Sequence, residues 1–148
     1  ALYEHLVNNR GIAAAITGID RRADLMETCE SIAKACDFEG LSFRVGDIAG
    51  AEIGQPDILI ALHACDTATD DALAQGVAAE ASIIVAAPCC HQQVRKQLQP
   101  PAELAEVLKH PVLLERTAET LTDGLRSMLL ESRGYATKLF EFVATEHT

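Results

Sequence analysis

Apolar and polar positions along the chain follow two different periods. Short apolar runs, each ending at a polar or small residue, alternate with longer segments in which apolar residues recur three and four positions apart. The short runs predict strands of a parallel sheet, buried where they are wholly apolar, and the longer segments predict amphipathic helices. The predicted strands cover residues 12–19, 41–45, 57–62 and 82–87.

The helical segments lie between these strands and after them. Residues 1–9 predict the end of a helix that stops at Gly11, and Pro100-Pro101 predicts the start of a short helix. Asp70, three residues after Thr67, predicts a capping box. The other predicted helices cover residues 24–36, 67–79 and 118–129, the last stopping at Arg133-Gly134.

A final alternating segment, residues 135–144, predicts a half-exposed strand. Strands that alternate with helices predict an α/β fold, with a mostly parallel sheet and helices on both of its faces. We expect one domain over residues 1–148, with the first four strands parallel and the last antiparallel. Ligands of such sheets bind at the carboxyl ends of the strands, and polar residues of this chain gather there.

Composition narrows the class of protein. The hydrophobic fraction of 49% is enough for a core, and the net charge of −10 does not indicate nucleic-acid binding. The odd number of cysteines, 5, favours free thiols in a reducing compartment. No apolar run approaches the roughly 20 residues that cross a membrane, and no leader pattern is visible. We therefore expect a cytoplasmic location and no membrane partner.

Two acids follow the first two strands. Asp20 is placed to accept hydrogen bonds from both ribose hydroxyls of a nucleotide cofactor, and Asp47 to accept one from the adenine amino group. The alternative for Asp20 is a helix cap or an ion pair with Arg21 or Arg22. The alternative for Asp47 is a loop cap after a glycine.

Two polar groups follow the third and fourth strands. His63, Cys65 and Asp66 are placed for proton transfer, or else His63 packs and Asp66 caps the next helix. Cys89, Cys90 and His91 follow the next strand, where adjacent cysteines are more often packed than bonded.

Further alternatives concern the same end of the sheet. His63, Cys65, Cys89 and His91 would form a two-nitrogen, two-sulfur zinc site if they faced one another. No Cys-x-x-Cys spacing supports a zinc site, and we predict that the chain holds no metal. Thr122-Asp123 either covers the site or lies on a solvated helix face.

Several segments together resemble a known family. They are GIDRR at 18–22, ALHACDTATDDAL at 61–73, APCCH at 87–91 and LTDGLRSMLLESRGY at 121–135. They resemble the class I, Rossmann-like methyltransferase domains with Leu-His-Ala-Cys and Pro-Cys-Cys-His signatures, among them the glutathione S-transferase C-terminal domain-containing protein. The resemblance covers nearly the whole chain.

The resemblance implies S-adenosylmethionine as the cofactor and an unidentified methyl acceptor. The residues expected at the cofactor are Asp20, Arg21, Asp47, Ile48, His63 and Ala64. The expected catalytic residues are His63, Cys65, Asp66, Cys90 and His91. Among them His63 is expected to move the proton, because an ordinary histidine pKa of about 6.5 suits work near neutral pH.

Against the family pattern, the chain starts after the first strand and its glycine-rich turn, and ends before the last strand. We therefore expect weak cofactor binding by this segment alone. The missing strand would lie between the strands ending at Asp20 and starting at Asp57. We expect these two strands to pair directly, or a second copy of the chain to fill the gap as a homodimer.

Two other functions remain open on the sequence. An acid after the second strand of the parent fold, the place of Asp20 here, serves the ribose of NAD equally well. A nucleotide-dependent oxidoreductase is therefore one alternative. A non-catalytic domain of the same fold that binds a metal or a partner through its thiols is the other.

Overall fold

The computed structural model describes residues 1–141, which divide into two compact units. Unit 1 is Ala1–Glu52 and unit 2 starts at Ile53. Each unit contains one pair of parallel strands joined by a helix, so the α/β class predicted from the sequence is confirmed. No helix among residues 1–141 is both long enough and apolar enough to span a bilayer.

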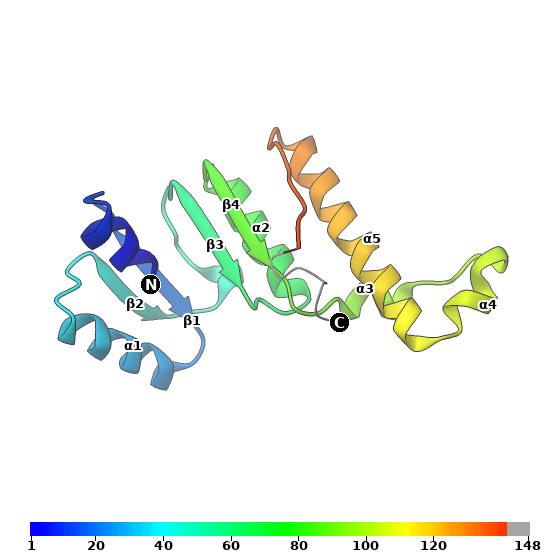
Figure 1. Cartoon of the computed structure of the whole chain (residues 1–148), viewed down its shortest axis with the longest axis horizontal. Helices are drawn as coiled ribbons and strands as arrows, with labels where there is room; N and C mark the ends of the chain where they lie inside the picture. Colours follow the sequence, from blue (N-terminus) through cyan, green and yellow to red (C-terminus); the bar gives the residue numbers. More distant parts are fainter. Residues whose placement is uncertain (142–148) are drawn as a thin grey trace. The chain divides into compact units, whose positions relative to one another are not determined.

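In unit 1, helix α1 packs against strands β1 and β2 (Figure 1). The elements are η1 (Glu4–Asn9), β1 (Ile16–Asp20), α1 (Ala23–Ala35), β2 (Leu41–Val45) and the short 3-10 helix η2 (Ile48–Gly50). The strands are parallel, with Ile16 opposite Leu41 and Asp20 opposite Val45. Their carboxyl ends therefore adjoin.

Strand β1 is shorter than the predicted strand over residues 12–19. It starts at Ile16 because its partner starts at Leu41, directly opposite, and a strand needs a neighbour to complete its hydrogen bonds. Tyr3 closes this end of the unit: its hydroxyl accepts a hydrogen bond from the Gly40 amide at 3.0 Å, and its ring lies 4.8 Å from that of Phe38.

Unit 2 repeats the strand–helix–strand arrangement and adds helices after it (Figure 1). Strands β3 and β4 are parallel, with Leu62 opposite Ala87, and helix α5 contacts both α3 and α4. The elements are β3 (Ile58–Leu62), α2 (Thr67–Ala78), β4 (Ile83–Ala87), α3 (Gln92–Gln97), η3 (Ala102–Leu104), α4 (Ala105–Leu108) and α5 (Pro111–Ser132).

The expectation that β3 and β4 are buried on both faces is wrong. Helix α2 covers one face, where Gly76 leaves room for Ile84 and Leu59 to approach its backbone. On the opposite face Ile60 is 44% exposed and Val85 is 42% exposed. An apolar run alone does not tell whether one or two layers of helix cover a strand.

One further expectation about the sheet is corrected and another stays open. Within residues 1–141, β1 pairs with β2 and β3 with β4. The expectation that β1 and β3 pair directly, or that a second copy of the chain fills the gap, stays a prediction. Residues 135–141 of the predicted last strand are not a strand, and residues 142–144 lie outside the described part. Instead, the Thr137 hydroxyl bonds to Ser127 and to Glu131, both on α5.

Candidate functional site

The carboxyl ends of β1 and β2 carry the two acids expected at a nucleotide. Asp20 is the last residue of β1, and one of its oxygens accepts a hydrogen bond from the Arg22 amide at 2.9 Å. Asp47 lies just after β2, where it caps η2 by accepting a hydrogen bond from the Ala49 amide at 3.3 Å. Its other oxygen pairs with the Arg21 guanidinium. Asp20 also lies 3.8 Å from Nε of Arg22, so the ion-pair alternative for Asp20 and the loop-cap alternative for Asp47 are both realised.

These local contacts leave both carboxylates with accepting capacity, because each ionised carboxylate has about four lone-pair positions. The Arg21 side chain is 74% exposed and that of Asp47 is 49% exposed. An ion pair this exposed contributes little to stability and is displaced at low cost. The contacts of Asp20 and Asp47 are thus compatible with a ligand at the same edge.

A hollow of about 270 Å³ opens beside Asp47. Ile19 at the end of β1 lines it, together with residues that follow β2. The full lining is Ile19, Arg44, Val45, Gly46, Asp47, Gly50, Ala51 and Glu52. Small-molecule pockets start at about 300 Å³, so this hollow suits part of a cofactor such as its nucleoside better than a whole dinucleotide.

Asp47 is held in its charged form. The Arg21 side-chain hydrogen bond is the main cause of a lowered pKa of Asp47, and the Ala49 amide adds to it. The carboxylate is therefore an acceptor throughout the physiological pH range. An amino group such as that of adenine is a matching donor.

In unit 2, three thiols meet at the carboxyl ends of β3 and β4. The sulfur atoms of Cys65, Cys89 and Cys90 all lie within 4.8 Å of one another, and those of Cys65 and Cys89 are 3.0 Å apart. Cys65 and Cys89 are exposed and Cys90 is half-buried. The expectation that the adjacent cysteines pack as buried residues is wrong for Cys89.

The thiols differ in acidity because they share protons. Hydrogen bonds to Cys89 and then Cys90 raise the pKa of Cys65 to about 12. The pKa of Cys89 is lowered, first by its hydrogen bond with Cys65 and next by one with His63. Cys89 therefore gives up its proton more readily than Cys65, and His63 lies beside it.

The turn after β3 is held in an unusual backbone conformation. His63 and Asp66 both have positive φ angles, of 56° and 54°, which are uncommon for residues other than glycine. The Thr69 hydroxyl donates to the carbonyl of Ala64. Asp66 does not cap α2 with its side chain; its carboxylate accepts from the Gln93 amide at 2.9 Å instead.

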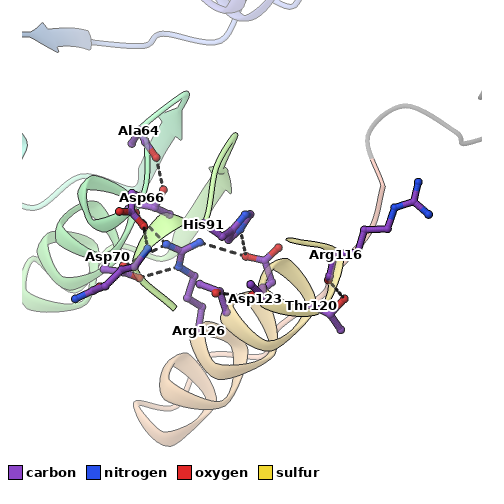
Figure 2. Close-up of polar contacts among 12 residues, drawn as sticks. Ala64, Asp66, Asp70, His91, Arg116, Thr120, Asp123 and Arg126 are labelled. Atoms are coloured by element: carbon purple, nitrogen blue, oxygen red, sulfur yellow. Dashed lines mark hydrogen bonds and ion pairs between the residues drawn. The ribbon is translucent and has the colours of Figure 1, made fainter. Parts of the chain in front are cut away.

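His91 points toward Asp123 on α5 (Figure 2). Its Nε2 lies 3.0 Å from an Asp123 oxygen, and the side chain is 6% exposed. Its Nδ1 is buried without a hydrogen-bond partner within residues 1–141. The alternative zinc set of His63, Cys65, Cys89 and His91 is therefore not brought together. Among the described residues the group is Cys65, Cys89 and Cys90 instead.

Arg126 of α5 joins the turn after β3 to the residues after β4. Figure 2 shows its guanidinium between Asp70 and Asp123, with hydrogen bonds of 2.7 and 3.2 Å to Asp70 and 3.2 Å to Asp123. A fourth bond of 3.0 Å reaches the Asp66 carbonyl. Asp70 therefore pairs with Arg126, not with the start of α2 as a capping box predicts.

Comparison with known proteins bears on this arrangement. The family model described as a methyltransferase domain matches residues 1–97. The chain belongs to this methyltransferase family. Neither the search of curated proteins nor the search of solved structures gave a match.

The matched part of this methyltransferase domain ends with α3, at Gln97. All the acids, histidines and cysteines expected at the site fall within it. Asp123 and Arg126 lie beyond it, on α5. Sequence reasoning left Asp123 open and missed Arg126, because an arginine in an amphipathic helix gives no local sign of a partner 56 residues away.

Proposed function

We propose that this chain transfers a methyl group from S-adenosylmethionine to an acceptor, on a Rossmann-like fold. The observation that carries the proposal is the pair of acids at the adjoining ends of β1 and β2, beside a hollow, in a chain of the methyltransferase family. In the proposal, unit 1 binds the nucleoside part of the cofactor. Unit 2 carries the groups that handle the acceptor.

The residues of unit 1 fit the donors of an adenosine. Asp20 accepts from the two ribose hydroxyls, and Asp47 from the adenine amino group. Arg21 and Ile48 flank these acids, and Arg21 swings away from Asp47 as the adenine enters. A hollow of about 270 Å³ accommodates the base, with Gly46 and Gly50 in its wall.

When bound, S-adenosylmethionine would supply a methyl group carried on a positively charged sulfur. The residues of unit 2 position the acceptor and remove its proton when it carries one. His63 is exposed beside the thiols and takes that role, near Ala64, Cys65 and Cys90. Asp66 and His91 act as positioning residues: Asp66 holds the start of α3, and His91 ties the same loop to α5.

Calorimetric titration of the natural full-length protein with S-adenosylhomocysteine, the product of the cofactor, tests the cofactor site. Asp20→Asn and Asp47→Asn should each weaken binding about tenfold or more, because each replaces a charged carboxylate by a neutral amide whose nitrogen cannot accept a hydrogen bond. Asp37→Asn is the matched control. Asp37 is exposed at the opposite end of the strands, and asparagine tolerates its positive φ of 53°.

The control should bind as the unchanged protein does. If Asp20→Asn, Asp47→Asn and Asp37→Asn all bind S-adenosylhomocysteine with equal affinity, the cofactor does not bind at this edge of unit 1. Far-ultraviolet circular dichroism of each variant distinguishes lost binding from lost folding.

A further inference from the structure

The proposed binding of a methyl acceptor does not explain why three thiols of unit 2, Cys65, Cys89 and Cys90, lie together. A thiol kept for packing is buried, but Cys65 and Cys89 are exposed. A thiol kept for a disulfide needs one partner, but three sulfurs meet here. Three exposed or half-exposed thiols at one point form a set of soft ligands.

Their convergence comes from the strand register. Leu62 and Ala87 lie opposite each other at the ends of β3 and β4, and the His63 amide donates to the Ala87 carbonyl at 3.3 Å. The two loops therefore leave the sheet side by side. Cys65 on one loop faces Cys89 and Cys90 on the other.

We propose that Cys65, Cys89 and Cys90 bind a zinc ion through their three sulfur atoms, with the fourth coordination position open to solvent. This site goes beyond the proposed methyl transfer, and its test does not involve the cofactor. As the ion binds, each coordinating thiol gives up its proton to solvent, so the sulfurs bind as thiolates.

The sulfur separations fit this ion. A tetrahedral zinc with bonds of about 2.3 Å to sulfur places its sulfur ligands about 3.8 Å apart. The sulfurs of Cys65 and Cys89 are 3.0 Å apart and all three sulfurs lie within 4.8 Å of one another, so the required separation is close at hand. Small changes in side-chain torsion complete the geometry.

His63 supports the site from outside the coordination sphere. Its ring hydrogen-bonds to Cys89, but it is not part of the group of atoms that lie within 4.8 Å of one another. A hydrogen bond to a ligating group typically changes metal affinity by about tenfold to a hundredfold.

The experiment uses the reduced, metal-free full chain and Co²⁺ as a spectroscopic substitute for zinc. We expect one cobalt ion per chain, with the visible bands of tetrahedral cobalt and a sulfur-to-cobalt charge-transfer band in the near ultraviolet. Zinc should displace the cobalt. Elemental analysis of chain reconstituted with zinc should give one tightly held ion.

Matched variants locate the site. Cys65→Ser, Cys89→Ser and Cys90→Ser should each weaken cobalt binding by about 100-fold or more. Cys36→Ser removes an exposed thiol of unit 1 and should leave binding unchanged. His63→Asn should weaken binding about tenfold and preserve the charge-transfer intensity, because all three sulfurs remain.

Three results would overturn the proposal. The first is that the reduced chain binds no metal. The second is that the variant lacking all three cysteines binds metal as well as the unchanged chain does. The third is that mass spectra show a Cys65–Cys89 disulfide in a chain that takes up no metal when reduced. Metal binding is measured first on the unchanged chain, so the proposal is tested even if a variant fails to fold.

Discussion

At the scale of single residues, the two acids of unit 1 differ in what holds them. Asp20 accepts a hydrogen bond from the backbone amide of Arg22 in its own turn. Asp47 is held by the side chain of Arg21, in the turn that follows β1. Exposed ion pairs of this kind place a carboxylate without burying it. Both acids therefore remain accessible at the edge where a cofactor is proposed.

The first residue-scale prediction concerns the pKa of Asp47. It lies below the ordinary value of 3.8 because Arg21 and the Ala49 amide favour the charged form. Arg21→Ala should raise it toward 3.8, and Arg22→Ala should not, because Arg22 contacts Asp20. Carbon-13 NMR of the Asp47 carboxyl during an acid titration measures the shift.

The sign of the linked stability follows from that direction. A lowered pKa in the folded state stabilises the fold above pH 3.8, and the contribution is lost as pH falls through the lowered pKa. If Arg21→Ala and Arg22→Ala move the Asp47 midpoint equally, the Arg21–Asp47 pair is absent in solution.

At the scale of elements, α5 is attached to the turn after β3 mainly through one side chain. Arg126 is 7% exposed and makes four hydrogen bonds to Asp66, Asp70 and Asp123. Asp123 in turn holds His91. The position of the loop after β4 therefore depends on a helix that lies beyond the matched family segment.

Replacing Arg126 tests this attachment. Arg126→Ala should lower the free energy of unfolding by about 2–3 kcal/mol. The loss is smaller than that from breaking a fully buried ion pair, because water can solvate Asp70 and Asp123 once the guanidinium is gone. Arg116→Ala is the matched control, since Arg116 lies on the same helix, is exposed, and points away from the cluster in Figure 2.

The control should change stability by less than about 0.5 kcal/mol, as surface substitutions usually do. Urea unfolding followed by circular dichroism compares the two. Equal stability in Arg126→Ala and Arg116→Ala would show that the bridge contributes nothing to the attachment of α5.

The same elements show what the sequence determines. Residues 41–45 form the predicted strand with the predicted bounds, because local alternation and flanking turns define it. Residues 135–141 alternate as well, yet form no strand, because a strand also needs a free edge and Thr137 bonds to α5 instead. Strand pairing and the contacts of Arg126 join residues that are far apart in the sequence. The local pattern of apolar and polar residues does not predict such contacts.

At the scale of the whole molecule, the methyltransferase match over residues 1–97 extends across both compact units. Unit 1 carries the acids of the proposed cofactor site, and unit 2 carries the thiols and histidines expected at the acceptor. The expectation of one domain over residues 1–148 remains a prediction, as does a homodimer. In the proposed function, methyl transfer uses residues of both units.

The most direct test of the central claim is an amide NMR titration of the natural full-length protein with S-adenosylhomocysteine, and separately with NAD⁺. The proposal predicts that S-adenosylhomocysteine shifts the amide signals of Gly46, Asp47 and Ala51, which line the hollow. NAD⁺, which shares only the adenosine part, should shift them less at the same concentration. Unchanged signals with S-adenosylhomocysteine, or equal shifts with NAD⁺, would contradict the account.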